Sequence, residues 1–95
     1  MQCIFSPFAV EDLEEIGDYI AKDNPNRAVT FTRSLRERCE KIPVFPEAAQ
    51  LHPEYGEGVR IIPYGNYLIV YTIQPDHIRI ERILSGFRNL PDILQ

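Results

Sequence analysis

Tryptophan is absent from this sequence, and sulfur-containing residues are scarce, with one methionine and two cysteines. Two cysteines as far apart as Cys3 and Cys39 provide neither the disulfide framework of a small secreted domain nor the spacing of a zinc site. We expect both to be small, buried or half-buried, reduced side chains, which suits a reducing cytoplasm. The chain does not open with a basic segment followed by an apolar run, so no signal peptide is predicted.

Excess positive charge is also lacking. Ten basic residues against fourteen acidic ones leave a net charge of −4, whereas proteins that bind nucleic acid through its phosphates carry a basic surface. The longest apolar run, residues 67–71, is far shorter than the roughly 20 residues of a membrane helix. The composition therefore predicts neither sequence-specific nucleic-acid binding nor membrane insertion.

Sequence motifs of catalysis are missing as well. The chain contains no P-loop, dinucleotide-binding turn, nucleophile elbow or zinc signature. His52 and His77 fall in a proline-rich loop and in a turn, and we expect neither to have a neighbouring acid or nucleophile that would form a triad. The sequence therefore predicts no catalytic residue, no metal ligand and no cofactor.

Two helix starts occur early in the chain. Ser6-Pro7 and Asn24-Pro25 each place a capping side chain before a proline, which is typical of the first turn of a helix. Apolar residues recur after them at helical spacing: Ala9, Leu13, Ile16 and Ile20, then Ala28, Phe31, Leu35, Cys39 and Ile42. Two helices joined by so short a connection form an antiparallel hairpin.

The polar faces of the two predicted helices carry opposite charge. The acidic residues of the first are Glu11, Asp12, Glu14, Glu15 and Asp18, and the basic residues of the second are Arg27, Arg33, Arg36, Arg38 and Lys41. We interpret most of these side chains as solvated, with some pairing across the hairpin that contributes about 0–1 kcal/mol per pair.

Strand patterns flank the helices on both sides. Residues 2–5 precede them, and residues 59–64, 67–74 and 77–85 follow, with turn residues between the last three segments. Residues 44–54 are predicted to be a loop with one helical turn at 47–51, and residues 90–94 to be a short helix or an apolar tail. The prediction is a single domain over residues 1–95 of the α+β class, ordered β-α-α-β-β-β, with the helical hairpin packed on a small, mainly antiparallel sheet.

The two hairpin turns fix a register for the last three strands. Counting back from them places Arg60 opposite Tyr71 and Ile69 opposite Arg82. Arg60, Tyr71 and Arg82 then share one face, unless a bulge at Pro63 turns Arg60 away. Two interpretations remain open: either Arg82 pairs with a carboxylate of the first helix, or the three side chains form a patch that holds an anionic or planar partner.

A resemblance to the ParE toxins of bacterial toxin–antitoxin modules, within the RelE/ParE superfamily, is carried by three segments: AVEDLEEIGDYIAKDNPNRA, GVRIIPYGNYLIVYTI and IRIERILSGFRN. It covers nearly the whole chain and implies the same β-α-α-β-β-β fold. RelE-like members cut messenger RNA on the ribosome, whereas ParE-like members poison DNA gyrase and have no recognised hydrolytic site.

The end of the last strand separates these two activities. ParE-like chains typically carry a histidine, glycine, arginine and aspartate where this chain has Ser85, Gly86, Arg88 and Asn89, and no tyrosine or histidine follows His77. A ribonuclease needs a group that activates the 2′-hydroxyl or stabilises the leaving group. The resemblance therefore implies a toxin that binds the A subunit of DNA gyrase, with a RelE-like mRNA endonuclease and a non-toxic binding module as alternatives. The residues carried over as gyrase contacts are Arg60, Tyr71, Arg82, Ser85 and Arg88.

The resemblance further implies a ParD-like antitoxin whose C-terminal segment wraps this chain in a toxin–antitoxin hetero-oligomer in the cytoplasm. A basic stripe on the second helix is expected to complement an acidic antitoxin segment and to speed association. Its residues are Arg27, Arg33, Arg36 and Arg38. The antitoxin, rather than this chain, would read operator DNA.

Overall fold

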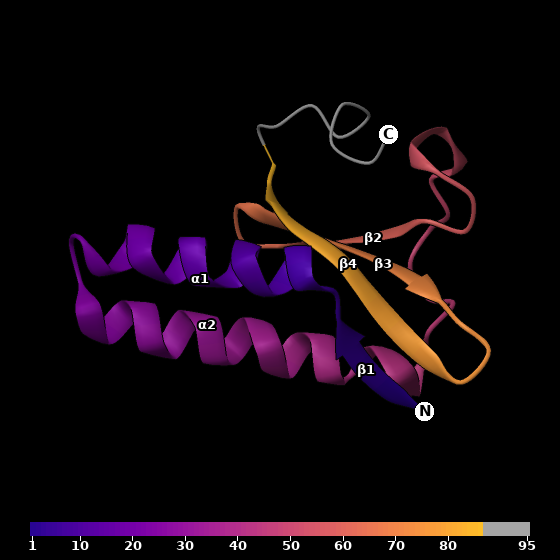
Figure 1. The fold of residues 1–95 in the computed structure, drawn as a ribbon, viewed down its shortest axis with the longest axis horizontal. Helices are drawn as coiled ribbons and strands as arrows, with labels where there is room; N and C mark the ends of the chain where they lie inside the picture. Colours follow the sequence, from indigo (N-terminus) through magenta and orange to yellow (C-terminus); the bar gives the residue numbers. More distant parts are fainter. Residues whose placement is uncertain (87–95) are drawn as a thin grey trace.

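A computed structural model describes residues 1–86 of the chain, so residues 90–94 lie outside the described part. Its elements are β1 (Gln2–Phe5), α1 (Pro7–Ala21), α2 (Pro25–Glu40), the 3-10 helices η1 (Ile42–Val44) and η2 (Pro53–Tyr55), β2 (Arg60–Tyr64), β3 (Tyr67–Ile73) and β4 (His77–Ser85). The predicted α+β class and element order are confirmed. In Figure 1 the two helices run side by side along the sheet, and the end at which they are joined projects beyond it.

Both helices begin where the capping signals predict. The Ser6 hydroxyl accepts a hydrogen bond from the Ala9 N–H at 3.0 Å, and the Asn24 side-chain oxygen accepts one from the Arg27 N–H at 3.0 Å. Most members of the predicted apolar stripes are buried: Ala9, Leu13, Ile16, Ala28, Leu35, Cys39 and Ile42. Most of these pack with Ile69, Tyr71 and Ile80, so the main core lies between the helical hairpin and one face of the sheet.

The segment between α2 and β2 differs from its prediction. Residues 47–51 contain turns and bends rather than the expected helical turn, and the short helices η1 and η2 lie on either side of them. Pro43 and Pro53 each occupy the first turn of a 3-10 helix, where a missing N–H is tolerated. Leu51 instead forms an isolated antiparallel bridge with Arg60, which requires an extended backbone there.

The four strands are ordered β1-β4-β3-β2, with β1 parallel to β4 and the other neighbours antiparallel, which confirms the mainly antiparallel sheet. β2 pairs with β3 without a shift, so Arg60 lies opposite Tyr71 as predicted. Gly65 has φ 59° in the connecting turn, a conformation that favours glycine. Because the register between β2 and β3 has no shift, Pro63 marks an edge strand rather than a bulge.

The register between β3 and β4 contains a bulge that the sequence analysis missed. Tyr71 pairs with Ile80, but the residue before it on β3, Val70, pairs with Arg82, so Glu81 has no partner on β3. Ile69 consequently lies opposite Ile83, and the predicted pairing of Ile69 with Arg82 is wrong. One extra residue reverses the side-chain alternation, and Arg82 leaves the face that Tyr71 occupies.

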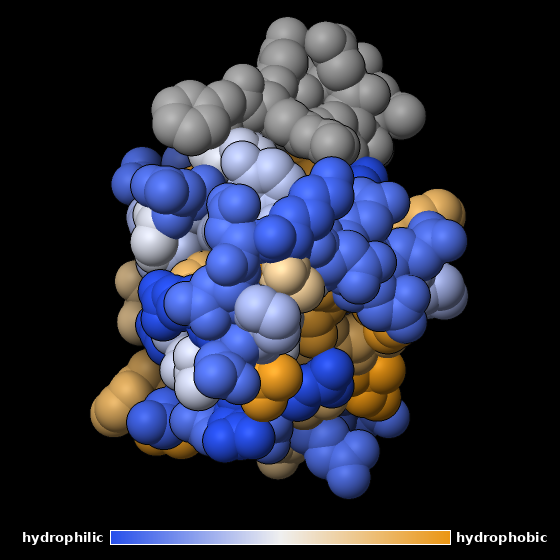
Figure 2. Space-filling view, turned by 90° about the vertical axis from the view of Figure 1, so that its left-hand side faces the viewer, coloured by the Kyte–Doolittle hydropathy of each residue, from blue (hydrophilic) through white to orange (hydrophobic). Residues whose placement is uncertain are grey.

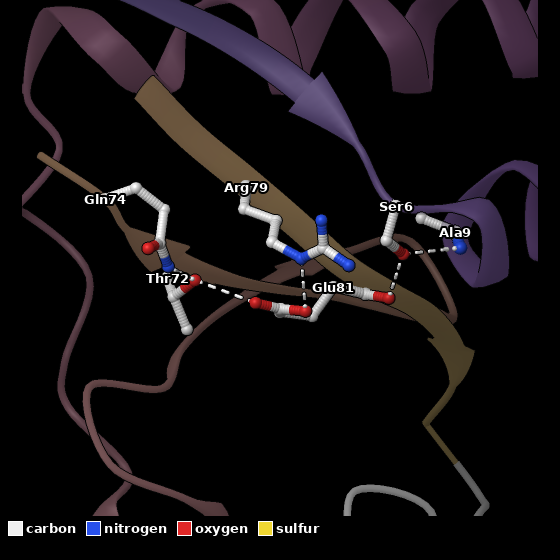
Figure 3. A network of polar contacts seen from close by, with 6 residues as sticks. All are labelled: Ser6, Ala9, Thr72, Gln74, Arg79 and Glu81. Atoms are coloured by element: carbon white, nitrogen blue, oxygen red, sulfur yellow. Dashed lines mark hydrogen bonds and ion pairs between the residues drawn. The ribbon is translucent and has the colours of Figure 1, made fainter. Parts of the chain in front are cut away.

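Contacts from three elements hold the bulge in place (Figure 3). The Ser6 hydroxyl, which caps α1, donates to the Glu81 carbonyl at 2.7 Å. The Glu81 carboxylate accepts hydrogen bonds from the Thr72 hydroxyl at 2.8 Å and from the Arg79 Nε at 3.0 Å. The start of α1 and the kink in β4 are therefore one connected unit.

Asp12 continues this connection along α1. Its carboxylate accepts hydrogen bonds from the Arg82 Nε at 2.7 Å, the Arg82 Nη2 at 2.9 Å and the Ile83 backbone N–H at 3.0 Å. The hydrogen bond to Asp12 is also the main cause that raises the pKa of Arg82. The interpretation that Arg82 pairs with a carboxylate of the first helix is thus confirmed, whereas the view of Asp12 as a solvated charge is wrong, since Asp12 is 8% exposed.

Replacing Asp12 tests this anchor. Asp12→Ala leaves a half-buried guanidinium and a buried N–H without their partner, so we expect a loss of about 3 kcal/mol in the free energy of unfolding. Urea denaturation followed by circular dichroism measures it. Glu14→Ala removes an exposed carboxylate from the same helix and should change the free energy by less than about 0.5 kcal/mol. Equal midpoints for the two variants would contradict the assigned role of Asp12.

Candidate functional site

The structure separates the residues that the sequence grouped as gyrase contacts. Arg60 and Tyr71 are cross-strand neighbours, whereas Arg82 lies beyond the bulge and is bound to Asp12. Ser85 ends β4 and is half-buried, and Arg88 lies outside the described residues. The predicted shared patch of Arg60, Tyr71 and Arg82 is therefore not formed.

Arg60 and Tyr71 instead hold the loop that follows η1, residues 45–52. Tyr71 has no exposed surface, and its hydroxyl donates to the Pro46 carbonyl at 2.6 Å. The Arg60 Nη1 donates to the Ala49 carbonyl at 2.6 Å and to the Glu47 carbonyl at 3.2 Å. Burial raises the pKa of Tyr71, so its hydroxyl remains a protonated donor. The two strand residues fix the position of this loop.

The fixed loop forms one wall of a groove of about 600 Å³, which we call the α2–β2 groove. The end of α2 contributes Arg38, η1 and the loop contribute Val44 and Phe45, and β2 contributes Ile62 and Pro63. Val44 is 67% exposed and Phe45 is 75% exposed, so an apolar surface faces solvent at the mouth of the groove. Sequence analysis missed this site, although two large apolar residues in a proline-rich loop were its signal.

A second groove of about 480 Å³ lies along α1, and we call it the α1–β4 groove. Its lining includes Tyr19 of α1, Leu84 and Ser85 of β4, and the turn residue Asn66. The charged residues among the described part of its lining are Asp12 and Glu15, both acidic. The two grooves thus differ in the sign of their charge, because Arg38 and Lys41 are the charged residues that line the α2–β2 groove within residues 1–86.

The arginines of α2 do not form the single stripe that was predicted. The Arg36 guanidinium lies 5.3 Å from the ring centre of Phe5, on the β1 side of the helix. The Arg27 guanidinium lies 5.1 Å from the ring centre of Phe31, which contacts aromatic residues of β2 and β3. Arg38 lines the α2–β2 groove, and Arg33 is exposed. Arg27 and Arg38 therefore share the β2 side of α2, and Arg36 lies on another.

Pairing between the helices is also not observed. None of the ion pairs within residues 1–86 joins α1 to α2. Figure 2 views the molecule from the end at which the helices are joined, and hydrophilic side chains cover most of that surface. The charges of the hairpin therefore face solvent there, which is the interpretation given to most of them from the sequence.

Both histidines pair with carboxylates close to them in the sequence, so the expectation that neither has a neighbouring acid is wrong. His52 Nδ1 lies 2.9 Å from the Glu54 carboxylate, and His77 Nδ1 lies 2.7 Å from that of Asp76, whose pKa the contact lowers. Within residues 1–86, no group of three or more histidine, cysteine or acidic side chains is placed to hold a metal ion. No helix in the same residues is long and apolar enough to span a membrane.

Comparison with known proteins places the chain in a recognised context. Residues 3–90 match the family described as the ParE toxin of the type II toxin–antitoxin system parDE. A solved structure described as a chromosomal ParDE toxin–antitoxin system from P. aeruginosa is similar in fold, with a TM-score of 0.77 and 20% sequence identity over 90% of this chain and 95% of that chain. No curated protein sequence matches the chain.

The support that Tyr71 gives to the loop can be measured. Tyr71→Phe leaves the Pro46 carbonyl without its donor, so we expect the free energy of unfolding to fall by about 1–2 kcal/mol. Amide hydrogen exchange should become faster in residues 45–52 while β3 keeps its protection. Tyr19→Phe is the control, because Tyr19 is 68% exposed. Unchanged exchange in the loop of Tyr71→Phe would show that the hydroxyl does not hold it.

The two thiols predict a dependence on alkaline pH. Burial raises the pKa of Cys3 to about 11 and that of Cys39 to about 12, from 9.0. Between pH 9.0 and the raised pKa of about 11 for Cys3 or about 12 for Cys39, the folded state binds more protons than the unfolded state. The free energy of unfolding therefore decreases as pH rises above about 9. Urea denaturation at several pH values should show a shallower decrease for the Cys3→Ala, Cys39→Ala double variant. Parallel curves for the two proteins would contradict this.

Proposed function

This chain belongs to the ParE toxin family of type II toxin–antitoxin systems, and from this premise we propose that it arrests its host by binding DNA gyrase and holding it on cleaved DNA. The family match over residues 3–90 is the observation that carries the proposal. In it, one toxin domain works in the cytoplasm on the A subunit of gyrase, and it acts by binding rather than by catalysis of its own.

The polar contacts of the described residues support binding over RNA cleavage. A nuclease related to RelE would use Arg60 and Arg82, yet one holds loop carbonyls and the other holds Asp12. His52 and His77 form contacts with neighbouring acids at separate places on the surface. Proton transfer to a reacting phosphate needs an acid or a base within hydrogen-bond reach of one common point. These side chains serve the fold or lie apart from each other.

The gyrase contacts are assigned to the end of β4. Ser85 lines the α1–β4 groove, and Arg82 precedes it on the same strand. Arg88 follows three residues later in the sequence. We assign Ser85 and Arg88 to direct contact. Arg82, Arg60 and Tyr71 have an indirect role in this assignment, because Asp12 holds Arg82 and the 45–52 loop holds the polar ends of the other two.

Membership of a parDE system implies a ParD antitoxin as the partner that neutralises the toxin. We propose that its segment binds along the β2 side of α2, where Arg27 and Arg38 lie. Of the basic residues predicted to contact the antitoxin, Arg33 and Arg36 then lie outside this path. The complex is then a toxin–antitoxin hetero-oligomer, and the antitoxin rather than the toxin contacts operator DNA.

A plasmid-cleavage assay tests gyrase poisoning. Purified gyrase, ATP and supercoiled plasmid should accumulate linear DNA when this protein is added, because trapped cleavage complexes release broken DNA on denaturation. Arg88→Ala should lower the linear fraction at least about tenfold if a charge-assisted contact of roughly 1.5 kcal/mol is lost. Arg33→Ala, an exposed change on α2, is the matched control and should leave it unchanged.

The alternative is tested in parallel with translating ribosomes. The proposal requires intact messages there, together with linear plasmid in the gyrase assay. Normal supercoiling by gyrase combined with cleaved messages on ribosomes would replace the proposed function with the endonuclease. Growth of a host that expresses the protein without any arrest would favour the non-toxic binding module.

A further inference from the structure

The α2–β2 groove combines apolar walls with cations. Ile42, Val44, Phe45 and Ile62 provide apolar lining, and two of these side chains are more than half exposed, Val44 at 67% and Phe45 at 75%. Small soluble proteins seldom leave adjacent large apolar side chains uncovered beside a concave surface unless another molecule covers them. The charged described residues of the lining are Arg38 and Lys41.

We propose that the α2–β2 groove is a preformed docking site for an acidic peptide segment that inserts a large apolar side chain between α2 and the 45–52 loop. Resting on the proposed function, the segment belongs to the antitoxin. The groove has a volume of about 600 Å³, which accommodates an aromatic or leucine side chain. Carboxylates on either side of that side chain in the segment pair with Arg38 and Lys41.

The groove is formed before anything binds. Its loop wall is held by the Tyr71 hydroxyl on Pro46 and by the Arg60 guanidinium on Ala49, both at 2.6 Å. The end of the loop is tied to the residue before β2 by the hydrogen bond from the His52 N–H to the Val59 carbonyl at 2.7 Å. A partner therefore pays little entropy to order this surface, and such preorganisation favours tight binding.

The geometry favours side-chain insertion over addition of a strand to the sheet. β2 is an edge strand, but Leu51 already bridges it at Arg60. Further along the strand, Pro63 has no N–H to donate to a new partner. With the edge closed at these two positions, a strand that bound there would gain few backbone hydrogen bonds.

Charge along the same side of α2 gives the segment its direction. Arg38 lies beside β2 residues Ile62 and Pro63, and Phe31 lies against Tyr64 with Arg27 over its ring. The seam between α2 and β2 thus runs from Arg38 to Arg27 with cations at both ends. Glu37 and Glu40 of the same helix do not line the groove. The α1–β4 groove carries Asp12 and Glu15 instead, which would repel an acidic segment.

Isothermal titration calorimetry tests the site by measuring how tightly the purified protein binds the ParD antitoxin of its own module. Arg38→Glu, Lys41→Glu should weaken binding at least about 100-fold, because two contacting cations become repulsive. The matched control is Lys22→Glu, Arg33→Glu, which makes the same change in charge at exposed positions away from the groove and should bind within about threefold of the wild type. Equal weakening of both double variants would overturn the proposal.

Ala48→Trp provides a second variant without any change of charge. Ala48 is exposed and lines the groove, so the indole fills it while the core is untouched, and we expect at least about tenfold weaker antitoxin binding. Wild-type affinity for Ala48→Trp would overturn the proposal. The other candidate occupant is a second copy of this chain, which sedimentation of the free protein tests. A dimer that Ala48→Trp converts to a monomer would assign the groove to self-association and would equally overturn the proposal.

Failure here is distinguishable from failure of the proposed function. The Arg38→Glu, Lys41→Glu variant, assayed without antitoxin, should still cause gyrase to accumulate linear plasmid. Antitoxin binding that depends on the groove supports the docking site even when wild-type protein leaves gyrase unaffected. Gyrase poisoning with antitoxin binding that is insensitive to the groove variants keeps the function and rejects the site.

Discussion

The arrangement of this molecule depends on the hydrogen bonds that the Asp12 carboxylate accepts from β4. It accepts two hydrogen bonds from Arg82 and one from the Ile83 N–H, and so joins α1 to the part of β4 that extends beyond β1. The Ser6 hydroxyl makes the neighbouring connection, to the Glu81 carbonyl. With both connections in place, the bulge at Glu81 is stable. The bulge then determines on which face of the sheet each later side chain of β4 lies.

The bulge in turn decides which polar side chains are free to serve function. Without it, Arg82 would share a face with Tyr71 and Arg60; with it, Ile83 takes that place in the core. On the same face, Arg60 and Tyr71 direct their polar ends to the 45–52 loop. The α2–β2 groove follows from this, because its outer wall is the loop that these two residues hold.

The sequence was sufficient wherever the determining contacts are local. The caps at Ser6 and Asn24, the apolar stripes and the register from Arg60 opposite Tyr71 all depend on residues close in the chain or on a tight turn. The bulge was not predictable, because Ser6 stabilises Glu81 across 75 residues. Asp12 looked like its acidic neighbours for the same reason: only its contact with β4 separates it from them. The family resemblance identified the fold, yet the groove required the positions of side chains.

The two grooves also bear on how an antitoxin segment would act on a distant contact surface. The seam beside α2 ends where Phe31 lies between Tyr64 and Tyr67, at the Gly65-Asn66 turn. The Asn66 carbonyl accepts the Gly86 N–H at 2.9 Å, just after Ser85. A segment anchored at Arg38 and continuing past Phe31 therefore reaches the turn that supports the end of β4. In this arrangement the anchor provides affinity, and the continuation of the segment approaches Ser85, so occupancy of the groove alone need not block the target.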